Sequence, residues 1–212
     1  MILIISPCME RLYLIRHGNA NYHYNCLTGD GETQVKNLIG RMKEDLPNNK
    51  RYSMVSSPSE RVYQTAEMIL PLIKQKSIDE ISILKDSRFS EIDSFFCFGE
   101  KMFEIGKEKV PMIEAYGNSC DVLVIASHEL LIAATGIAVA EKYGMICPPN
   151  LGRIKQYTEE DILRDIKEYS LPREKIIAAY DKSFCDELPK IPEASAVSLD
   201  FIDKKVRLIM NI

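Results

Sequence analysis

Short apolar runs alternate along the chain with longer segments in which apolar residues recur every three or four positions. The runs at 12–15, 52–55, 81–84 and 122–126 have the length and continuous hydrophobicity of buried strands. The spacing predicts helices over 35–46 after the N-cap Thr28, over 63–73, and from His128 to about Gly144. This alternation indicates an α/β fold in three αβα layers, with helices on both faces of a mostly parallel sheet.

The C-terminal residues have a different periodicity. Apolar residues occupy every second position at 197–201 and again at 206–210, on either side of Asp203 and Lys204. This pattern predicts an antiparallel hairpin that closes the sheet edge. Because no internal repeat or Gly/Ser linker interrupts the sequence, we expect a single domain over 1–212. We further expect a small lid around 92–120 and an extra helical segment around 145–192.

Composition narrows the class of protein. The 212 residues are 46% hydrophobic and carry a formal net charge of -4, which predicts no general attraction to nucleic acid or anionic membranes. Six scattered cysteines without a CxxC pair, together with three histidines, do not favour a zinc site. The apolar start is too short for a membrane span and lacks a basic flank, so we expect a cytoplasmic protein with reduced thiols.

Two of the predicted strands lead directly into residues that can bind an anion. Arg16 and His17 follow the first strand, and His128 and Glu129 follow the strand at 122–126. Ligands of parallel sheets bind beyond the carboxyl ends of the strands. We therefore expect these side chains to meet in one pocket.

A third candidate, Arg61, lies near the expected start of the second helix. There Ser57 is expected to be the N-cap, Pro58 the first helical residue and Glu60 the end of a capping box. An arginine opposes the helix dipole at this end, which makes sense if an anion binds in front of it. Arginine binds phosphate bidentately, and a histidine flanked by arginines is pushed towards its neutral, nucleophilic form. The pattern predicts a phosphate pocket with His17 as nucleophile.

Five segments carry a resemblance to a known family. They are "LYLIRHG" (12–18), "LTGDGETQ" (27–34), "SSPSERVYQTAEM" (56–68), "IASHE" (125–129) and "EASAVSLDF" (193–201). In this order they resemble the signatures of the histidine phosphatase superfamily, also called the phosphoglycerate mutase-like family. RHG alone is a weak signal, whereas the ordered set is specific.

The resemblance implies a role for each matching residue. His17 would be the nucleophile, and Arg16, Arg61 and His128 would hold the transferred phosphoryl group. Glu91, in "FSEID", resembles the family's general acid, which protonates the leaving oxygen and later activates water. No metal or other cofactor is implied, because fixed cationic donors stabilise the developing charge.

Several departures from the family pattern leave alternatives open. Asp93 rivals Glu91 as the acid, because the segment around them departs from the family's usual sequence. Glu129 is the third candidate, since another branch of the family places its acid directly after the second histidine. Tyr22 and His23 stand where the family often has tryptophan and asparagine. His23 is therefore a candidate hydrogen-bond donor to the phosphate.

The function expected from these residues is hydrolysis of a phosphomonoester through a phosphohistidine, without a metal. The partner is a small phosphorylated substrate, with a phosphoprotein as an alternative, and the oligomeric state is open. A phosphoglycerate mutase-type phosphoryl transfer is the second hypothesis, although the segment between His17 and Thr28 is shorter than in mutases of the family. A non-catalytic phosphate-binding module is the third.

Overall fold

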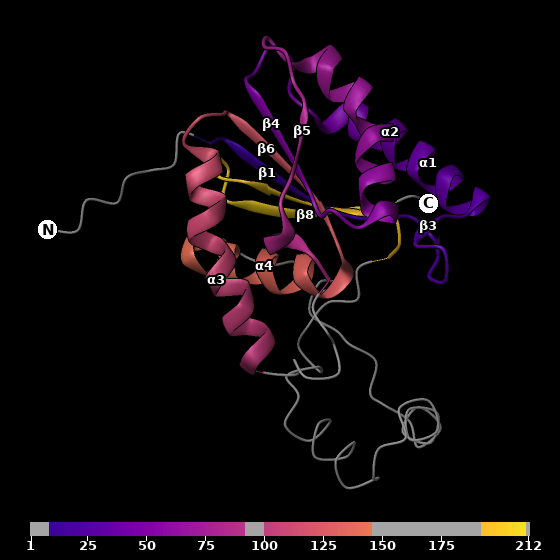
Figure 1. Ribbon diagram of the computed structural model, residues 1–212. Coiled ribbons are helices and arrows are strands. Elements are labelled where there is room, and N and C mark those ends of the chain that lie inside the picture. Colours follow the sequence, from indigo (N-terminus) through magenta and orange to yellow (C-terminus); the bar gives the residue numbers. More distant parts are fainter. Residues whose placement is uncertain (1–8, 92–99, 146–191, 211–212) are drawn as a thin grey trace, which may run out of the picture.

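The computed structural model describes residues 9–91, 100–145 and 192–210, with only the backbone described at 100–103. Within these ranges the central sheet has six strands in the order β5-β4-β6-β1-β7-β8 (Figure 1). They are β1 (Arg11–Arg16), β4 (Tyr52–Ser56), β5 (Ile83–Lys85), β6 (Val122–Ser127), β7 (Ala196–Asp200) and β8 (Lys205–Ile209). The first four are mutually parallel, and the hairpin of β7 and β8 joins antiparallel beside β1. The predicted fold class is confirmed.

Four helices of the described residues cover the two faces of the sheet (Figure 1). They are α1 (Gly29–Asp45) and α2 (Glu60–Lys76) on one face, and α3 (Glu100–Gly117) and α4 (Glu129–Lys142) on the other. Successive residues of a strand point to opposite faces. In β1, Leu12 and Leu14 therefore belong to the core under α3 and α4, whereas Tyr13 and Ile15 belong to the core under α1 and α2.

The loop after β1 is held tightly against the start of α1. Thr28 is the N-cap of α1, as predicted, and its hydroxyl accepts a hydrogen bond from Gly31 N–H at 3.0 Å. A Cβ atom on Gly31 would lie 2.0 Å from the carbonyl oxygen of Asn19, and one on Gly18 would lie 2.5 Å from that of Gly31. Both glycines are therefore required by the close approach of two backbone segments. A separate short hairpin, β2 (Ala20–Asn21) with β3 (Cys26–Leu27), completes this loop.

The predicted start of α2 is wrong. The helix begins at Glu60, with Ser59 as N-cap and no side-chain capping bond. The Ser57 hydroxyl instead accepts from Ser59 N–H at 3.2 Å and contacts the His128 ring. Ser57 and Pro58 thus form a turn before the helix, because the Ser57 side chain is engaged with the neighbouring strand end.

The expected lid and helical segment fall partly outside the described residues. Residues 92–99, and with them Asp93, lie outside, as do residues 146–191. The rest of the expected lid includes α3, which packs closely against α4: a Cβ on Gly106 would lie 2.4 Å from the Ala134 carbonyl oxygen. Val110 and Ile113 of α3 are buried in the core. The lid and the division into one domain stay predictions.

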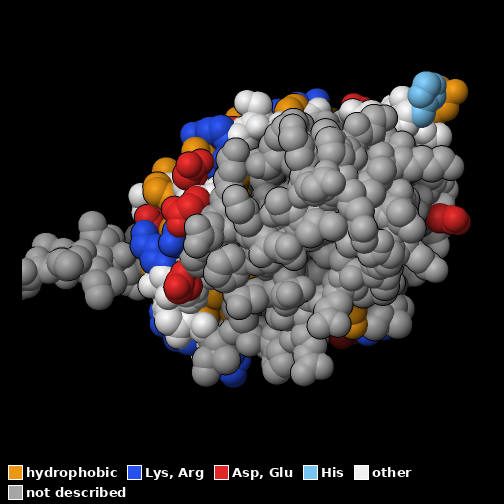
Figure 2. Space-filling model, turned by 90° about the horizontal axis from the view of Figure 1, so that it is seen from below, with side chains coloured by type: hydrophobic (Ala, Val, Ile, Leu, Met, Phe, Trp, Pro, Cys, Tyr) orange, Lys and Arg blue, Asp and Glu red, His pale blue; other side chains and the backbone are white. Residues whose placement is uncertain are grey.

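The surface of the described residues is mixed in charge. Seen from below in Figure 2, basic and acidic side chains lie next to one another at one edge of this face. Among the helices that the structure describes, none combines the length and the apolar character that a bilayer crossing needs.

Candidate active site

The site is assembled where β1 and β6 end side by side. Arg16 and Ser127 are partners in the parallel ladder, so the residues that follow them, His17 and His128, leave the sheet together. Both histidines are buried, and their ring centroids are 5.4 Å apart at an interplanar angle of 73°. The structure therefore brings together the two strand ends that the sequence singled out.

Arg61, in the first turn of α2, connects these histidines to each other. Its Nε lies 3.3 Å from His17 Nε2, and its Nη2 lies 3.4 Å from His128 Nδ1. The same Nη2 forms an ion pair with Glu91, and Nη1 donates to Asn25 Oδ1 at 2.5 Å. Arg61 is only 5% exposed, so its charge lies in the interior of the site.

The contacts of His17 define its protonation. Its Nδ1 lies 2.7 Å from the carbonyl oxygen of Gly18, which can only accept, so Nδ1 carries the proton. Arg61 can only donate, so Nε2 is the unprotonated nitrogen. Burial lowers the pKa of His17, and the positive charges of Arg61 and Arg16 lower it further, although the Gly18 bond opposes them. His17 is therefore a neutral imidazole with its lone pair on Nε2.

His128 has the opposite tautomer. Its Nδ1 accepts from Arg61, so Nε2 carries the proton and donates to the Ser57 hydroxyl at 3.2 Å. Burial, the electrostatic coupling to His17 and the positive charges of Arg61 and Arg16 lower the pKa of His128 to about 3. Two neutral histidines and a buried arginine thus share one site.

Glu91 lies beside Arg61 at the end of an anchored segment. It follows a short 3₁₀ helix, η1 (Ser87–Phe89), whose N-cap Asp86 accepts from Arg88 N–H at 2.9 Å. The Ser127 hydroxyl donates to the Phe89 carbonyl oxygen at 2.7 Å, which fastens this segment to the end of β6. The Glu91 side chain is 58% exposed, so it can exchange protons with solvent.

Glu129, the first residue of α4, holds the other arginine. Its Oε2 lies 3.0 Å from Arg16 Nη1, and both side chains are largely buried. Of the three carboxylates considered as the acid, Glu91 and Glu129 are thus both at the site.

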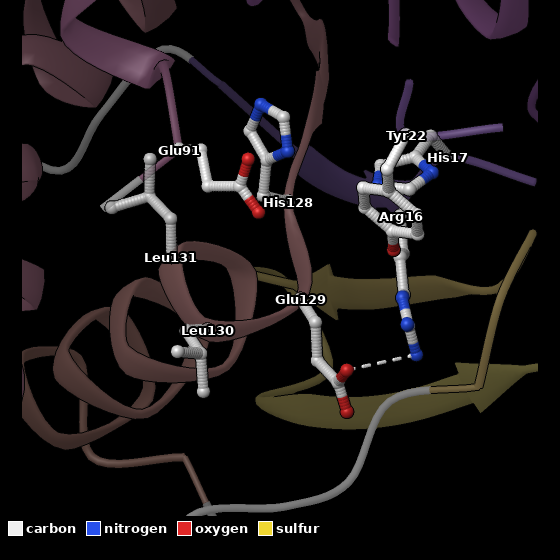
Figure 3. A pocket seen from close by; sticks show the side chains of 8 residues that line it. All are labelled: Arg16, His17, Tyr22, Glu91, His128, Glu129, Leu130 and Leu131. Carbon is white, nitrogen blue, oxygen red and sulfur yellow. Dashed lines mark ion pairs between the residues drawn. The ribbon is translucent and has the colours of Figure 1, made fainter. Parts of the chain in front are cut away.

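A cavity of about 130 Å³ opens between these groups (Figure 3). Its lining residues are Arg16, His17, Tyr22, Glu91, His128, Glu129, Leu130 and Leu131. The Tyr22 ring lies 4.9 Å from Arg61 Cζ and meets the His17 ring edge-on at 6.5 Å. His23 is not among the lining residues: its ring packs against Tyr24 at 4.7 Å on an exposed loop. A role for His23 in substrate binding stays a prediction.

Sequence reasoning missed two contacts of the site. Asn25, whose amide oxygen accepts from Arg61, was not singled out, although its left-handed backbone (φ 52°) is one that asparagine tolerates well. Ser57 was assigned to the helix start instead of to His128. The Ser57-Pro58 pair, three residues before Arg61, was the available signal for a turn here.

The comparisons with known proteins agree with this arrangement. The model of the histidine phosphatase superfamily (branch 1) matches residues 12–132, so the chain belongs to this superfamily. A search of proteins with curated descriptions found no significant match.

Solved structures of phosphatases have the same fold. The mycobacterial glucosyl-3-phosphoglycerate phosphatase matches with a TM-score of 0.51 and 18% identity, over 95% of this chain and 97% of its own. A mutant of phosphoserine phosphatase from Entamoeba histolytica, in complex with phosphoserine, matches with a TM-score of 0.51 and 14% identity, over 94% and 95%. At these identities the likeness concerns the fold.

Proposed function

We propose that this protein hydrolyses phosphomonoesters without a metal ion, through a phosphohistidine at His17. The observation that carries the proposal is the unprotonated Nε2 of a buried, neutral His17, 3.3 Å from the cationic donor Arg61 Nε. In the site without substrate, Arg61 Nε–H donates a hydrogen bond to the lone pair of His17 Nε2. A phosphoryl group that enters presents oxygens to the guanidinium and its phosphorus to Nε2, which fits nucleophilic catalysis beside a fixed charge.

The reaction takes two displacements at phosphorus. In the first, His17 Nε2 forms a bond to phosphorus, the bond to the ester oxygen breaks, and Glu91 gives its proton to that oxygen. In the second, Glu91 takes a proton from water, the water oxygen attacks phosphorus, and the P–N bond breaks. Arg16 and Arg61 donate to the phosphoryl oxygens in both steps. His128 joins them when the bound anion takes Arg61 away from its Nδ1 and that nitrogen takes up a proton from the entering ester, because a nearby anion favours the charged imidazole.

The substrate class is a small phosphorylated molecule. Membership of the superfamily and the phosphatase neighbours, whose names include phosphoserine and a glucosyl phosphoglycerate, support this choice. We place the activity in the cytoplasm, which is consistent with free thiols at the described cysteines Cys26 and Cys120.

The test is release of inorganic phosphate from an aryl phosphate in the presence of a metal chelator. We expect His17→Ala to lower kcat/KM by about 10³-fold or more, as loss of a nucleophile does. His23→Ala is the matched comparison, because it removes a histidine that does not line the cavity, and it should lower the rate far less than His17→Ala. Equal rates for the parent and His17→Ala would contradict the enzymatic proposal and favour a binding module.

A second assay distinguishes the mutase hypothesis from the hydrolase proposal. The parent is incubated with phosphoglycerate, with and without a bisphosphate primer. Primer-dependent isomerisation that exceeds phosphate release would favour the mutase over the hydrolase.

A further inference from the structure

Strand β6 ends in a buried hydroxyl group. Its residues 122–126 are apolar, whereas the last residue, Ser127, is a buried serine. A hydroxyl that leaves water costs free energy unless it finds a hydrogen-bond partner. The partner of Ser127 is not on its own strand, because its hydroxyl donates to the Phe89 carbonyl oxygen at 2.7 Å, 38 residues earlier in the chain. The polar side chain at the end of β6 therefore holds the segment that leads to Glu91.

Contacts with three other elements hold that segment in place. Asp86 N–H donates to the Ser56 carbonyl oxygen at 2.9 Å, which fastens the start of η1 to the end of β4. The Asp86 carboxylate accepts from the Tyr116 hydroxyl of α3 at 2.7 Å. The bond from Ser127 of β6 is the one nearest to Glu91, because its acceptor lies two residues before it. Of these contacts, the one with Ser127 therefore controls the position of Glu91 most directly.

Glu91 depends on this backbone support once a substrate binds. Without substrate, an ion pair with Arg61 fixes the Glu91 carboxylate, and the side chain is otherwise 58% exposed. A phosphoryl group that enters the site takes the guanidinium, and a carboxyl group that is about to give up a proton is neutral. The ion pair is then lost, so the position of Glu91 is set by the backbone that leads to it.

Given the proposed function, we propose that Ser127 is a positioning residue, which holds Glu91 within reach of the leaving oxygen by way of the Phe89 carbonyl group. A general acid transfers its proton over a hydrogen-bond distance of about 2.6–3.2 Å. When the ester bond breaks, its electron pair stays on the leaving oxygen, and the proton of Glu91 moves to that oxygen. Loss of the Ser127 hydroxyl releases the Phe89 carbonyl, so the end of the segment moves and this distance lengthens.

Two aryl esters with leaving groups of different acidity test this role. Para-nitrophenolate leaves as a stable anion, whereas phenolate needs a proton from the acid, so phenyl phosphate depends more strongly on Glu91. We measure kcat/KM for both esters, because it includes the step in which the leaving group departs. We expect Ser127→Ala to lower kcat/KM about tenfold more for phenyl phosphate than for para-nitrophenyl phosphate, and Glu91→Gln about 10²-fold more. Urea unfolding verifies that both variants are folded.

A double variant identifies the route of the effect. If Ser127 acts through Glu91, Ser127→Ala changes the ratio of the two rates no further in a Glu91→Gln protein. Ser198→Ala removes a buried serine of β7 and is the matched control, which should leave the ratio at the parent value. A Ser127 that acted only on His128 or on stability would lower both rates equally. An unchanged ratio in Ser127→Ala, or the same change of ratio with and without Glu91, therefore overturns the inference.

Failure of the proposed function gives a different result. If the parent releases phosphate from neither ester, the hydrolase proposal fails, and the support of the segment is then measured by hydrogen exchange. We expect amide exchange across 87–91 to be about fivefold faster in Ser127→Ala than in the parent, and unchanged in Ser198→Ala. Faster exchange there supports the positioning role of Ser127, whereas exchange at the parent rate overturns it.

Discussion

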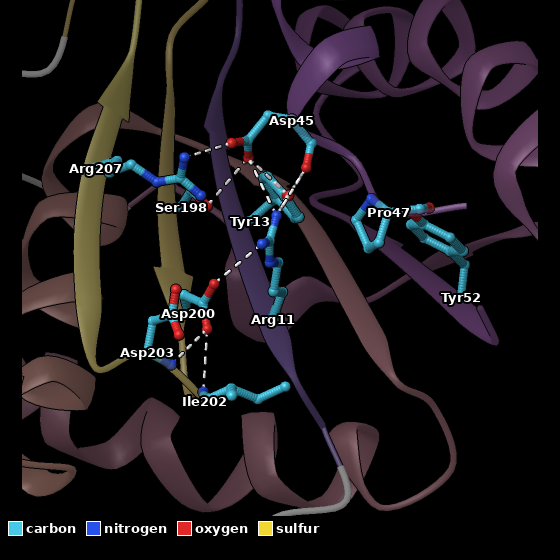
Figure 4. A network of polar contacts seen from close by, with 10 residues as sticks. All are labelled: Arg11, Tyr13, Asp45, Pro47, Tyr52, Ser198, Asp200, Ile202, Asp203 and Arg207. Carbon is cyan, nitrogen blue, oxygen red and sulfur yellow. Dashed lines mark hydrogen bonds and ion pairs between the residues drawn. The ribbon is translucent and has the colours of Figure 1, made fainter. Parts of the chain in front are cut away.

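Two polar clusters lie at opposite ends of β1, and both are built from arginines, carboxylates and hydroxyl groups. The candidate site lies at the carboxyl end of the strand. At the other end is a network of Arg11, Tyr13, Asp45, Ser198, Asp200 and Arg207, which we call the Asp45 network (Figure 4). The comparison separates a cluster that holds the fold together from one that is arranged for a ligand.

In the Asp45 network the donors converge on protein acceptors. The Asp45 carboxylate accepts from Tyr13 at 2.8 Å and pairs with Arg207 at 2.8 Å, and Arg11 binds both the Asp45 carbonyl at 2.7 Å and Asp200 at 3.1 Å. Burial raises the pKa of Tyr13 to about 12, so its hydroxyl remains a donor. Asp45 ends α1, where an acidic residue opposes the helix dipole, and the two arginines compensate. The network thus ties α1 to three strands.

In the candidate site the central arginine has weaker partners. Arg61 donates to two neutral histidine nitrogens and pairs with a carboxylate that is mostly exposed. These contacts lie against a cavity, so an anion can replace them. The residue types of the two clusters are similar, and what differs is that the ion pairs of the candidate site border an open cavity.

The largest effect is expected from Arg61→Ala. Loss of one fixed donor to a developing charge lowers the rate by about 10²–10³-fold, so kcat/KM for an aryl phosphate should fall by that factor. Urea unfolding should show that the variant remains folded. Arg11→Ala, in the Asp45 network, is the matched arginine substitution and should leave the kcat/KM of the folded protein within about threefold. A larger loss for Arg11→Ala would remove the distinction between the clusters.

Asp45→Ala should act on stability instead. It leaves the Tyr13 hydroxyl and the Arg207 guanidinium without their main acceptor, and we expect the free energy of unfolding to fall by about 2 kcal/mol. Glu44→Ala, one residue earlier on the exposed side of α1, should change it by less than about 0.5 kcal/mol. Urea titration measures both, and equal effects of the two variants would show that the network contributes little.

Acid should destabilise the protein through the candidate site. Unfolded His128 takes up a proton near its ordinary pKa of about 6.5, whereas the folded residue stays neutral down to about pH 3. The unfolded state therefore binds more protons in this window, and the free energy of unfolding falls as the pH falls, by up to about 1.4 kcal/mol per pH unit. His128→Asn should reduce this slope between pH 6.5 and pH 4.5. The same slope in parent and variant would contradict the protonation assigned to His128.

Ser57→Ala should have the smallest effect of the series. The Ser57 hydroxyl accepts a hydrogen bond from His128 Nε2–H and fixes the orientation of the ring. Its loss should lower kcat/KM by about tenfold, which corresponds to the free energy of one hydrogen bond. Ser57→Thr, which restores a hydroxyl, should recover most of the activity. Failure of this rescue, with both variants equally stable in urea, would assign Ser57 no role in positioning His128.

The fold and the meeting of Arg16, His17 and His128 could be predicted because their signals are local. Continuous apolar strands that end in Arg16-His17 and Ser127-His128 determine which side chains leave the sheet together, since parallel strands end at one edge. Thr28 is a confirmed cap because its side chain bonds within its own turn. Ser57 was predicted wrongly because its partner, His128, comes from a distant strand.

The loop after β1 shows the limit of the sequence most clearly. Position relative to the family pattern favoured His23, yet Tyr22 is the loop residue that lines the cavity and Asn25 the one that bonds Arg61. Which side chains of a short loop turn inwards depends on backbone angles such as the positive φ of Asn25, and these follow from packing against α2. The Asp45 network was also missed, because its members are scattered from β1 to β8.

The central claim is a covalent bond between His17 Nε2 and phosphorus, and trapping that bond tests it most directly. The parent is mixed with a radiolabelled phosphomonoester, quenched in alkali, which preserves phosphohistidine, and digested for mass spectrometry. The account predicts a phosphoryl group on His17 that disappears in His17→Asn and is released by acid. Turnover of the ester with no label on His17, or with equal label on His17→Asn, would contradict it.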